Sequence, residues 1–535
     1  MIREIVHALI YTVLQRLDHL PTTKVLKYPH DVLEVAFQRF KSKVFSEHFV
    51  PYKFYPRRSR FEPGVDGTRT LITEITIEET SYVSLGNGQH TVSPEAYSIN
   101  VSQDGTTLLQ ILSPEGGIHA FDTLVQLFYA HSAARGVYTP YAPVLITDAP
   151  AFEHRGLNLD ISRNWIAPRD VFRTIEAMGF NKFNKLHLHA TDAQSWPLEI
   201  PALPDLSRKG AYREGQVWTT KDLEDVQRYG LYHGVEVYLE IDLPGHTASI
   251  FHSYPDLITA YNKPWDKYAQ EPPSGQLKLN SPDVPPFLTT LFNDLLPRIQ
   301  TYSTHFHIGG DEINKEAYVL DPTVQSSSKA VLQPLLQKFM NHILSLLESH
   351  SLTPIVWEDM LLEWDLKFPA PTIIQTWRSA SSLAKVVEKG HRALFGPCEE
   401  WYLDCGFGTF IDPKDPRDPD SAIKYPYRDW CAPYKNWRQI LSYDPLADIP
   451  EERKYLVVGG EVHLWGELTD GINLDGMLWP RAAAAAEVLW RGKGEVGEGT
   501  TRRLAEMRER LVARGVGAGM VQMTWGLMNE GSCIL

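Results

Sequence analysis

Short apolar runs alternate with helically spaced stretches over the C-terminal two thirds of the chain. There are eight such runs: Arg155–Ser162, Lys185–Asp192, Val235–Leu243, Thr304–Glu312, Pro354–Asp359, Thr372–Trp377, Arg392–Pro397 and Lys454–Glu467. Helical spacing separates most of them, at Asp170–Met178, Lys221–Tyr232, Ser328–Glu348 and Ser382–Lys389. Eight βα units over roughly 350 residues predict an α/β fold, a (β/α)8 TIM barrel with insertions.

The first 150 residues have a mixed pattern. Helical spacing at Val32–Phe45 and Gly117–His131 accompanies alternating segments at Leu71–Ile77, Tyr97–Val101 and Thr107–Leu112. Strands grouped with flanking helices predict a smaller α+β domain over residues 1–150. The barrel and a C-terminal extension then occupy residues 151–535. We interpret Phe410–Pro450, rich in Pro, Asp and Tyr, as a long loop after the seventh strand.

The N-terminus carries a short apolar stretch that fits an amphipathic helix. Its apolar positions are Ile5, Leu9, Val13, Leu14 and Leu17. A signal peptide fits less well, because Glu4 stands in the region that should be basic and no small-residue cleavage site follows. No segment approaches the roughly 20 apolar residues of a membrane span.

Composition places the chain among globular proteins and narrows its partners. Of 535 residues, 43% are hydrophobic and 22% charged, and the net charge is −14 without a long basic run. This argues against nucleic acid and anionic membranes as main partners. The four cysteines show no zinc spacing; Cys405 and Cys431 could form one disulfide, or be free and buried. Asn100-Val-Ser is a glycosylation sequon of a kind that also arises by chance.

Chemically active residues follow the apolar part of six runs. They occur in Leu188–Asp192, Glu240–Asp242, Asp311-Glu312, Trp357–Asp359, Gln375–Trp377 and Trp465–Glu467. In such barrels the active site lies at the C-terminal ends of the strands, so these groups should converge. Two glycines precede Asp311 and Glu312, and repulsion between these carboxylates predicts a raised pKa for one of them, as a general acid requires. The alternative for this stretch alone is an exposed acidic turn.

Clustered carboxylates and tryptophans without an obvious metal-ligand set suggest glycoside hydrolysis, with no metal or cofactor. Indole faces can pack on sugar rings. His187-x-His189 also suits a metal-dependent amidohydrolase, but the later strand ends offer Trp357 and Trp377 where further imidazoles would be needed. A non-catalytic glycan-binding barrel is the other alternative. An endo-chitinase would carry a spaced run of acids on one strand, which the sequence lacks.

An ordered series of motifs resembles the β-N-acetylhexosaminidases of glycoside hydrolase family 20, fungal members above all. The motifs are Arg155-Gly-Leu-Asn-Leu-Asp, His189-Ala-Thr-Asp-Ala-Gln-Ser-Trp-Pro, Glu240-Ile-Asp-Leu-Pro-Gly-His-Thr, His307-Ile-Gly-Gly-Asp-Glu, Trp401-Tyr-Leu-Asp-Cys and His463-Leu-Trp-Gly-Glu. The resemblance runs from about residue 32 to the C-terminus. It implies an exo-acting enzyme that removes N-acetylglucosamine or N-acetylgalactosamine from a carbohydrate substrate.

The resemblance also implies a role for each site residue. The nucleophile is the substrate's own acetamido oxygen, as in substrate-assisted families. Glu312 is then the general acid, and Asp311 and Tyr402 hold the acetamido group. Asp192 and His246 form a polar relay behind Glu312. The remaining assignments concern binding: Trp357, Trp377 and Trp465 wall the pocket, and Arg155, Asp404 and Glu467 hold sugar hydroxyls. For Arg155 the alternative is an ion pair at the bottom of the barrel.

The first thirty residues depart from the family pattern. They lack the usual signal peptide and early strand, so an edge strand of the first domain could be missing and the chain could be a shortened form. Secretion is implied by the resemblance although no signal peptide is evident. A homodimer is an open expectation. In Thr191-Asp192-Ala193, the alanine replaces a polar residue common in the family, and we expect little effect.

Overall fold

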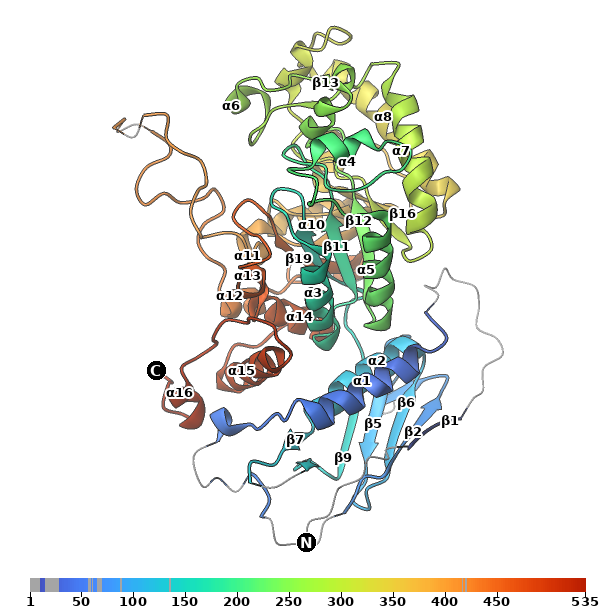
Figure 1. Cartoon of the computed structure of the whole chain (residues 1–535), viewed down its shortest axis with the longest axis vertical. Coiled ribbons are helices and arrows are strands. Elements are labelled where there is room, and N and C mark those ends of the chain that lie inside the picture. Colours follow the sequence, from blue (N-terminus) through green and yellow to red (C-terminus); the bar gives the residue numbers. More distant parts are fainter. Residues whose placement is uncertain are drawn as a thin grey trace.

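The chain folds into a barrel and a smaller α+β part that packs beneath it (Figure 1). The computed structural model describes residues 10–14, 28–55, 59, 61–64, 70–86, 89–133, 136–415, 417–418 and 421–535. Among these residues, no helix is long and apolar enough to cross a membrane.

Eight parallel strands close the barrel, and all eight lie within the predicted runs or within a residue of them. In order around the barrel they are β10 (His154–Asp160), β11 (Lys185–His189), β12 (Glu236–Glu240), β15 (His305–His307), β16 (Thr353–Trp357), β17 (Ile373–Gln375), β18 (Arg392–Phe395) and β19 (Val457–Leu464). β10 pairs with β19 and closes the circle. Every residue of β10 and β19 is buried, because helices cover the outside of a parallel barrel and side chains fill its interior.

Helices return the chain between strands and cover the outside of the barrel. The longer ones are α3 (Pro168–Phe180), α5 (Thr220–Tyr232), α7 (Val284–Ile299), α8 (Lys329–Ser349), α10 (Ala380–Glu388) and α14 (Arg481–Arg491). The shorter ones are α4 (Asp205–Gly210), α6 (Trp265–Tyr268), α9 (Glu358–Leu362), α11 (Cys398–Trp401), α12 (Trp437–Ser442) and α13 (Leu474–Leu478). α5 begins at a capping box in which Thr219 and Asp222 satisfy each other's backbone N–H.

The N-terminal part is a five-stranded sheet with two helices on its barrel-facing side (Figure 1). Its order is β1 (Ile10–Leu14), β2 (Glu74–Glu79), β6 (Thr107–Ile111), β5 (Tyr97–Val101) and β9 (Val144–Asp148). The helices are α1 (Val32–Ser46) and α2 (Pro114–Gln126), and the rings of Phe37, Phe40 and Phe121 pack between them. Two small hairpins complete it: β3 (Val83–Gly86) with β4 (Gln89–Thr91), and β7 (Tyr129–Ala130) with β8 (Val137–Tyr138).

The structure corrects two predictions in this part. Ile10–Leu14 is an edge strand paired parallel to β2, not a helix, so the early strand that we expected to be missing is present. Five residues are too few to separate the two periodicities, and the sheet edge supplies the hydrogen bonds that decide between them. Ile5, Leu9 and Leu17 lie outside the described residues. α2 ends at Gln126, because Tyr129 pairs with Tyr138 in a hairpin.

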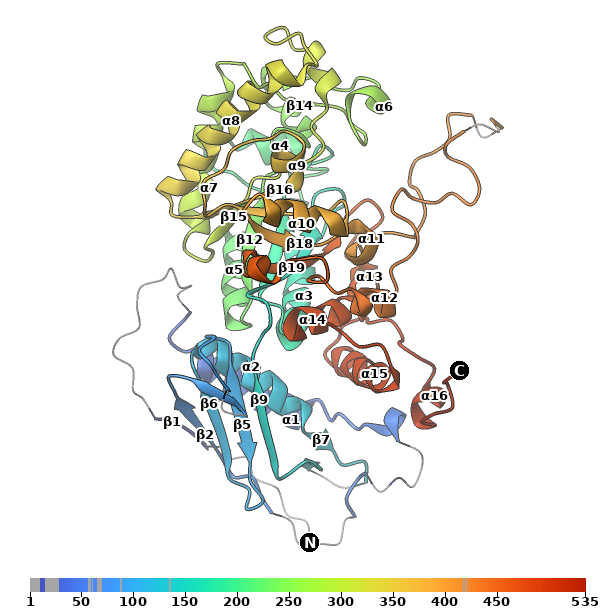
Figure 2. The ribbon, with the colours of Figure 1, turned by 180° about the vertical axis from the view of Figure 1, so that it is seen from behind.

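The C-terminal extension ties the two parts together (Figure 2). It contains α15 (Glu498–Ala513) and α16 (Thr524–Met528). After α15, Arg514 forms an ion pair with Glu47 of the N-terminal part at 2.8 Å and stacks on Phe180 of the barrel at 3.3 Å. The segment between α11 and α12 instead projects away from the barrel, as both ribbon views show.

Candidate active site

Three catalytic candidates from three strand ends form one chain of contacts. Asp192 follows β11, His246 follows β12 and Glu312 follows β15. Nδ1 of His246 lies 3.1 Å from Oδ1 of Asp192, and its Nε2 lies 3.5 Å from Oε2 of Glu312. Residues 120 positions apart in the sequence therefore meet at the C-terminal end of the barrel, as the strand order predicts.

The backbone after β15 is left-handed at Gly309, Gly310 and Glu312, and the side chains of Asp311 and Glu312 differ in exposure. Gly309 (φ 74°) needs to be glycine, since a Cβ there would lie 1.8 Å from Oδ1 of Asp242. Glu312 has φ 52°, which costs an L-residue about 1–2 kcal/mol. Its N–H donates to Oδ1 of Asp359 at 3.2 Å, which helps to hold this conformation. The side chain of Asp311 is 13% exposed and that of Glu312 29%, so only Glu312 reaches well into the pocket.

Asp311 belongs to a buried pair of carboxyl groups with Asp242. Burial raises the pKa of Asp311 well above its ordinary value, and the charge of Asp242 raises it further. Burial likewise raises the pKa of Asp242 to about 6, while its Oδ1 accepts a hydrogen bond from the N–H of Gly310 at 2.7 Å. The pair therefore holds a proton more tightly than an isolated carboxylate would.

His246 and Asp192 are a charged pair behind Glu312. Burial works against charge on both residues. The charges of Asp192 and Asp242 nevertheless raise the pKa of His246 well above its ordinary value, and those of Arg163 and His246 lower the pKa of Asp192. His246 is thus an imidazolium in contact with Glu312, and Asp192 is an ionised carboxylate.

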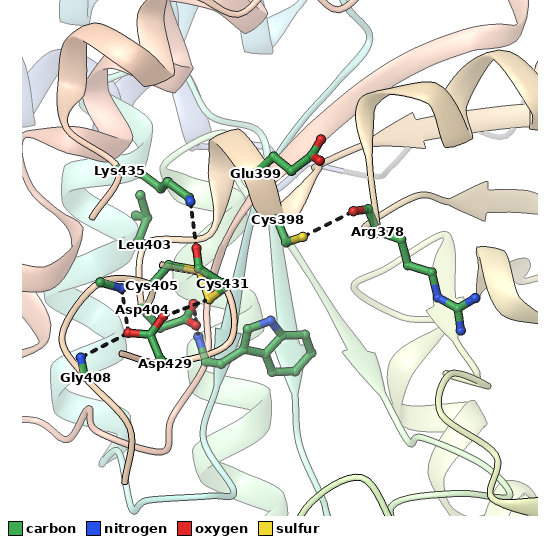
Figure 3. Close-up of a disulfide and its surroundings, with 12 residues drawn as sticks. Arg378, Cys398, Glu399, Leu403, Asp404, Cys405, Gly408, Asp429, Cys431 and Lys435 are labelled. Atoms are coloured by element: carbon green, nitrogen blue, oxygen red, sulfur yellow. Dashed lines mark hydrogen bonds between the residues drawn. A yellow bond between two sulfur atoms is a disulfide. The ribbon is translucent and has the colours of Figure 1, made fainter. Parts of the chain in front are cut away.

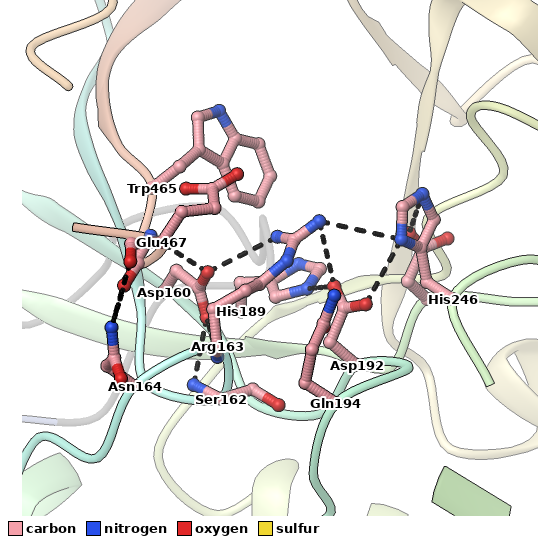
Figure 4. A network of polar contacts seen from close by, with 12 residues as sticks. Asp160, Ser162, Arg163, Asn164, His189, Asp192, Gln194, His246, Trp465 and Glu467 are labelled. Atoms are coloured by element: carbon pink, nitrogen blue, oxygen red, sulfur yellow. Dashed lines mark hydrogen bonds and ion pairs between the residues drawn. The ribbon is translucent and has the colours of Figure 1, made fainter. Parts of the chain in front are cut away.

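Arg163 is a site residue that the sequence interpretation missed. Its guanidinium contacts Asp192 at 3.1 Å, Asp160 at 3.2 Å and Glu271 at 2.9 Å, and lies 5.0 Å from the ring centroid of Trp465 (Figure 4). Burial disfavours its charge, but Asp192 and Glu271 raise its pKa well above the ordinary value. The signal was available, because Arg163 stands three residues beyond the end of the first barrel strand, where site residues are expected.

Arg155, which we predicted to bind sugar, lies at the opposite end of the barrel. It stands near the start of β10, fully buried. Its guanidinium donates to the carbonyl oxygens of Lys182 and Phe152, pairs with Glu95 of the N-terminal part and stacks on Trp490. The prediction for Arg155 is therefore corrected: it is the bottom ion pair, and it joins the barrel to the N-terminal part. Arg155 was assigned from its place in a family motif. It stands at the start of its strand, whereas the site residues follow the C-terminal ends of the strands.

Four aromatic side chains form one wall of the pocket. Trp357, Trp465 and Tyr402 pack in a single cluster, with Trp377 partly buried against it. The indole N–H of Trp357 donates to Glu240 at 2.7 Å and that of Trp377 donates to Asp359 at 2.8 Å, so both rings are fixed. Burial raises the pKa of Tyr402, which keeps its hydroxyl a hydrogen-bond donor.

A second aromatic feature at the rim of this wall was not predicted. Trp430 is 70% exposed and meets Trp377 and Tyr402 edge to face, with ring centroids 6.1 and 6.2 Å away. It precedes Cys431, whose bond to Cys405 confirms the disulfide considered from the sequence (Figure 3). An exposed indole on a loop held by a disulfide offers a flat face to a ligand.

Two further carboxyl groups close the side of the pocket nearest Trp465. Oδ1 of Asp404 accepts the N–H of Trp465 at 3.3 Å, and burial raises the pKa of Asp404 to about 6. Burial and the charge of Glu271 raise the pKa of Glu467 well above its ordinary value. Asn164 fixes this segment by donating to the carbonyl oxygen of Glu467 at 3.1 Å. With Arg155 excepted, the structure brings every predicted site residue to this end of the barrel.

One buried cluster inside the barrel consists of residue types that can bind a metal ion. Nitrogen and oxygen atoms of His187, Glu240 and His307 lie within 4.8 Å of one another. Nδ1 of His307 lies 2.9 Å from the backbone nitrogen of Gly309 and 3.1 Å from Oε1 of Glu240. Burial disfavours charge on His187, but Glu461 and Glu240 raise its pKa to about 9. An ion pair between a protonated His187 and these carboxylates accounts for the cluster.

A barrel whose strand ends combine a general-acid candidate, a buried pair of carboxyl groups and an aromatic wall has the features of a glycoside hydrolase. Comparison with known proteins gives the family. Residues 152–493 match the catalytic domain of glycosyl hydrolase family 20, and residues 12–127 match a β-acetyl hexosaminidase-like domain. The chain therefore belongs to glycosyl hydrolase family 20 and is a β-N-acetylhexosaminidase. The match from residue 12 extends the resemblance beyond the start expected at residue 32.

Relatives and solved structures agree with this assignment. The chain is 48% identical over 517 residues to a β-hexosaminidase of Arthroderma benhamiae, covering 94% of this chain and 85% of that one. It is 31% identical to a chitooligosaccharidolytic β-N-acetylglucosaminidase of Ostrinia furnacalis, covering 94% and 83%. The fold resembles a Vibrio harveyi exo-β-N-acetylglucosaminidase of the same family, with a TM-score of 0.73, 20% identity and coverage of 96% and 75%.

Proposed function

We propose that this enzyme is exo-acting and releases terminal N-acetylglucosamine or N-acetylgalactosamine, with retention, by a substrate-assisted mechanism. The observation that carries the proposal is the unlike placement of two adjacent carboxyl groups. Glu312 reaches the pocket and contacts His246, whereas Asp311 is buried beside Asp242. This arrangement suits a proton donor, Glu312, beside a carboxylate that binds the acetamido group, Asp311. It does not suit an acid and a nucleophilic carboxylate on opposite sides of the glycosidic bond.

In the first step the acetamido carbonyl oxygen attacks C1 of the sugar. The bond between C1 and the glycosidic oxygen breaks, and Glu312 gives its proton to that oxygen. An oxazolinium ion forms. Because the nucleophile belongs to the same sugar, proximity supplies much of the rate. Asp311 accepts the acetamido N–H and stabilises the developing positive charge, while the hydroxyl of Tyr402 donates to the carbonyl oxygen.

In the second step the carboxylate of Glu312 takes a proton from water, which attacks C1 from the side of the departed group. The acetamido group is regenerated and the product retains its configuration. During both proton transfers His246 contacts Glu312, and Asp192 contacts His246. Trp357, Trp377 and Trp465 pack against the sugar ring and the acetamido group. Asp404, Glu467 and Arg163 bind the sugar hydroxyls.

Separate observations support a substrate class and a location. The chitooligosaccharidolytic activity of the Ostrinia furnacalis relative, together with the exposed ring of Trp430 beyond the pocket, supports chito-oligosaccharides among the substrates. The Cys405–Cys431 disulfide supports a secreted enzyme, because disulfides persist in oxidising compartments. The homodimer stays a prediction.

Turnover of matched aryl glycosides tests the mechanism. The enzyme should cleave 4-nitrophenyl N-acetyl-β-glucosaminide and barely cleave 4-nitrophenyl β-glucoside, which lacks the acetamido nucleophile. Glu312→Gln should lose turnover by orders of magnitude while its unfolding curve stays unchanged. Equal rates on the two glycosides would rule out substrate assistance. The 4-epimeric N-acetylgalactosaminide, in the same assay, then gives the sugar preference.

A further inference from the structure

Acidic and imidazole side chains alternate along a path from Glu312 into the barrel. The first links are those of the site, Glu312 to His246 at 3.5 Å and His246 to Asp192 at 3.1 Å. The path does not stop at Asp192. Its Oδ2 lies 2.6 Å from Nε2 of His189, and Nδ1 of His189 lies 2.5 Å from Oε2 of Glu240.

The path then continues down the barrel axis. Nε2 of His187 lies 3.1 Å from the same oxygen of Glu240, and its Nδ1 lies 3.0 Å from Oε2 of Glu461. Oε1 of Glu461 lies 2.7 Å from His154, near the start of β10. Acids and imidazoles therefore alternate from the substrate end of the barrel to its opposite end, and beyond Glu312 the side chains are at most 7% exposed.

Alternation keeps the path balanced in charge. An imidazolium can donate from both nitrogens and a carboxylate can only accept, so Asp192 and Glu240 each lie between two imidazoles of opposite charge. Burial opposes charge on His189, yet Glu240 and Asp192 raise its pKa well above the ordinary value. Burial opposes charge on Glu240 as well, but His307 and His189 lower its pKa. Neither residue can change its charge without disturbing the other.

We propose that His189 and Glu240 are positioning residues for the hydrolysis, which hold Asp192 in place and, through it, hold His246 in contact with Glu312. His189 supplies Asp192 with a cation on the side away from the substrate. Glu240 keeps that cation charged, and it also accepts the indole N–H of Trp357 at 2.7 Å. One carboxylate thus links the general acid to the wall of the pocket.

Other charged or aromatic groups also face Asp192, Glu240 and His189. Asp192 also faces Arg163 and His246. Glu240 also faces His187 and His307, and its charge acts on Asp242. The ring of Trp465, the residue after β19, lies 5.0 Å from the ring of His189. Loss of charge at His189 would leave Asp192 less compensated, and the excess negative charge behind the proton donor would move the alkaline limb of activity to higher pH.

The test compares Glu240→Gln with Glu236→Gln on the same strand. Both glutamates are buried, and Glu236 accepts from Ser303, Thr304 and Lys185, outside the path. Glu240→Gln should move the alkaline limb of the kcat/KM profile to higher pH by about half a unit and lower kcat several-fold. Glu236→Gln should lose a similar amount of stability and leave the limb in place. An alkaline limb that is unmoved, or moved downwards, in Glu240→Gln overturns the proposal.

Two further measurements apply if Glu240→Gln does not fold. His189→Gln removes the same cation and should move the limb in the same direction. In wild-type enzyme labelled with ¹⁵N-histidine, the His189 signal, identified by its loss in His189→Gln, should show both nitrogens protonated at neutral pH; a neutral ring overturns the proposal. The inference rests on the proposed role of Glu312. If Glu312→Gln kept its turnover, the proposed function would fail, whereas the NMR result would stand by itself.

Discussion

The N–H of Glu312 donates a hydrogen bond to Oδ1 of Asp359, across 3.2 Å between two neighbouring strand ends. The other oxygen of Asp359 accepts the indole N–H of Trp377 at 2.8 Å, and Arg378 pairs with the carboxylate. One side chain therefore fixes both the backbone of the proposed general acid, in its left-handed conformation, and part of the aromatic wall of the pocket. Asp359 stood at a predicted strand end, but its role depends on these two contacts.

Asp359→Asn should lower kcat by about 10- to 100-fold, since a mismatched buried hydrogen bond costs about 1–3 kcal/mol. The amide nitrogen must face a donor, either the indole N–H of Trp377 or the N–H groups of Glu312 and Arg378. Steady-state kinetics on the aryl N-acetylglucosaminide measures the loss. Glu363→Gln is the matched control, because Glu363 also pairs with Arg378 but is not bonded to Glu312 or Trp377. Equal losses in both variants would assign the effect to Arg378.

Asp242→Asn should move the acidic limb of activity to lower pH. In the proposed mechanism Asp311 acts as a carboxylate. Burial and Asp242 raise its pKa, so it should become protonated, and activity should fall, as the pH drops. Without the neighbouring charge, the pKa of Asp311 falls and activity persists in more acid solution. The amide oxygen of the introduced asparagine can still accept the N–H of Gly310. A pH profile of kcat/KM decides; an unchanged acidic limb would mean that another group controls it.

Arg163 and Arg155 should separate activity from stability. Arg163→Lys should lower kcat/KM by about 10- to 100-fold, because lysine lacks the planar donors that reach Asp160, Asp192 and Glu271 together. Arg155→Lys should lower the midpoint of thermal unfolding and leave kcat/KM of the folded enzyme unchanged. If Arg155→Lys lost activity without losing stability, the corrected assignment would be wrong.

Removing the disulfide should loosen the rim of the pocket. Cys405 and Cys431 are 26 positions apart, and closing a loop of that length contributes about 3 kcal/mol in the chain-entropy account. The double variant Cys405→Ala/Cys431→Ala should unfold at lower denaturant concentration and show a raised KM, because Trp430 and Asp404 adjoin the bridge. Dithiothreitol should weaken the wild type and leave the double variant unaffected; the remaining cysteines, Cys398 and Cys533, are free.

Glu358 should make stability depend on pH between about 5 and 8. Burial raises its pKa to about 7, so the folded state binds a proton that the unfolded chain releases near pH 4.5, and stability falls as the pH rises through this interval. The free energy of unfolding of Glu358→Gln relative to wild type should therefore increase by about 2 kcal/mol from pH 5 to pH 8. Urea titrations at both pH values measure it, and a constant difference would contradict the raised pKa.

The barrel was predictable because its signals are local. Each strand is a short apolar run with polar residues after it, and each helix carries its own spacing, so eight units could be counted without any contact. The positions of Asp311, Glu312, Trp357 and Trp465 follow from the same rule about strand ends. Arg163 would also have followed from it, whereas Arg155 was taken from a motif and lies at the wrong end.

By itself, the sequence determined the fold class, the end of the barrel that carries the site, and the carboxylates and indoles that compose it. The tertiary structure alone decided how the pKa values of the site groups shift, since the pKa of Asp311 depends on Asp242, 69 positions earlier, and that of His189 depends on Glu240, on the next strand. It also decided that Ile10–Leu14 is a strand. The physical reason is common to these cases: charge interactions and strand pairing act across space, between residues whose separation the sequence does not reveal.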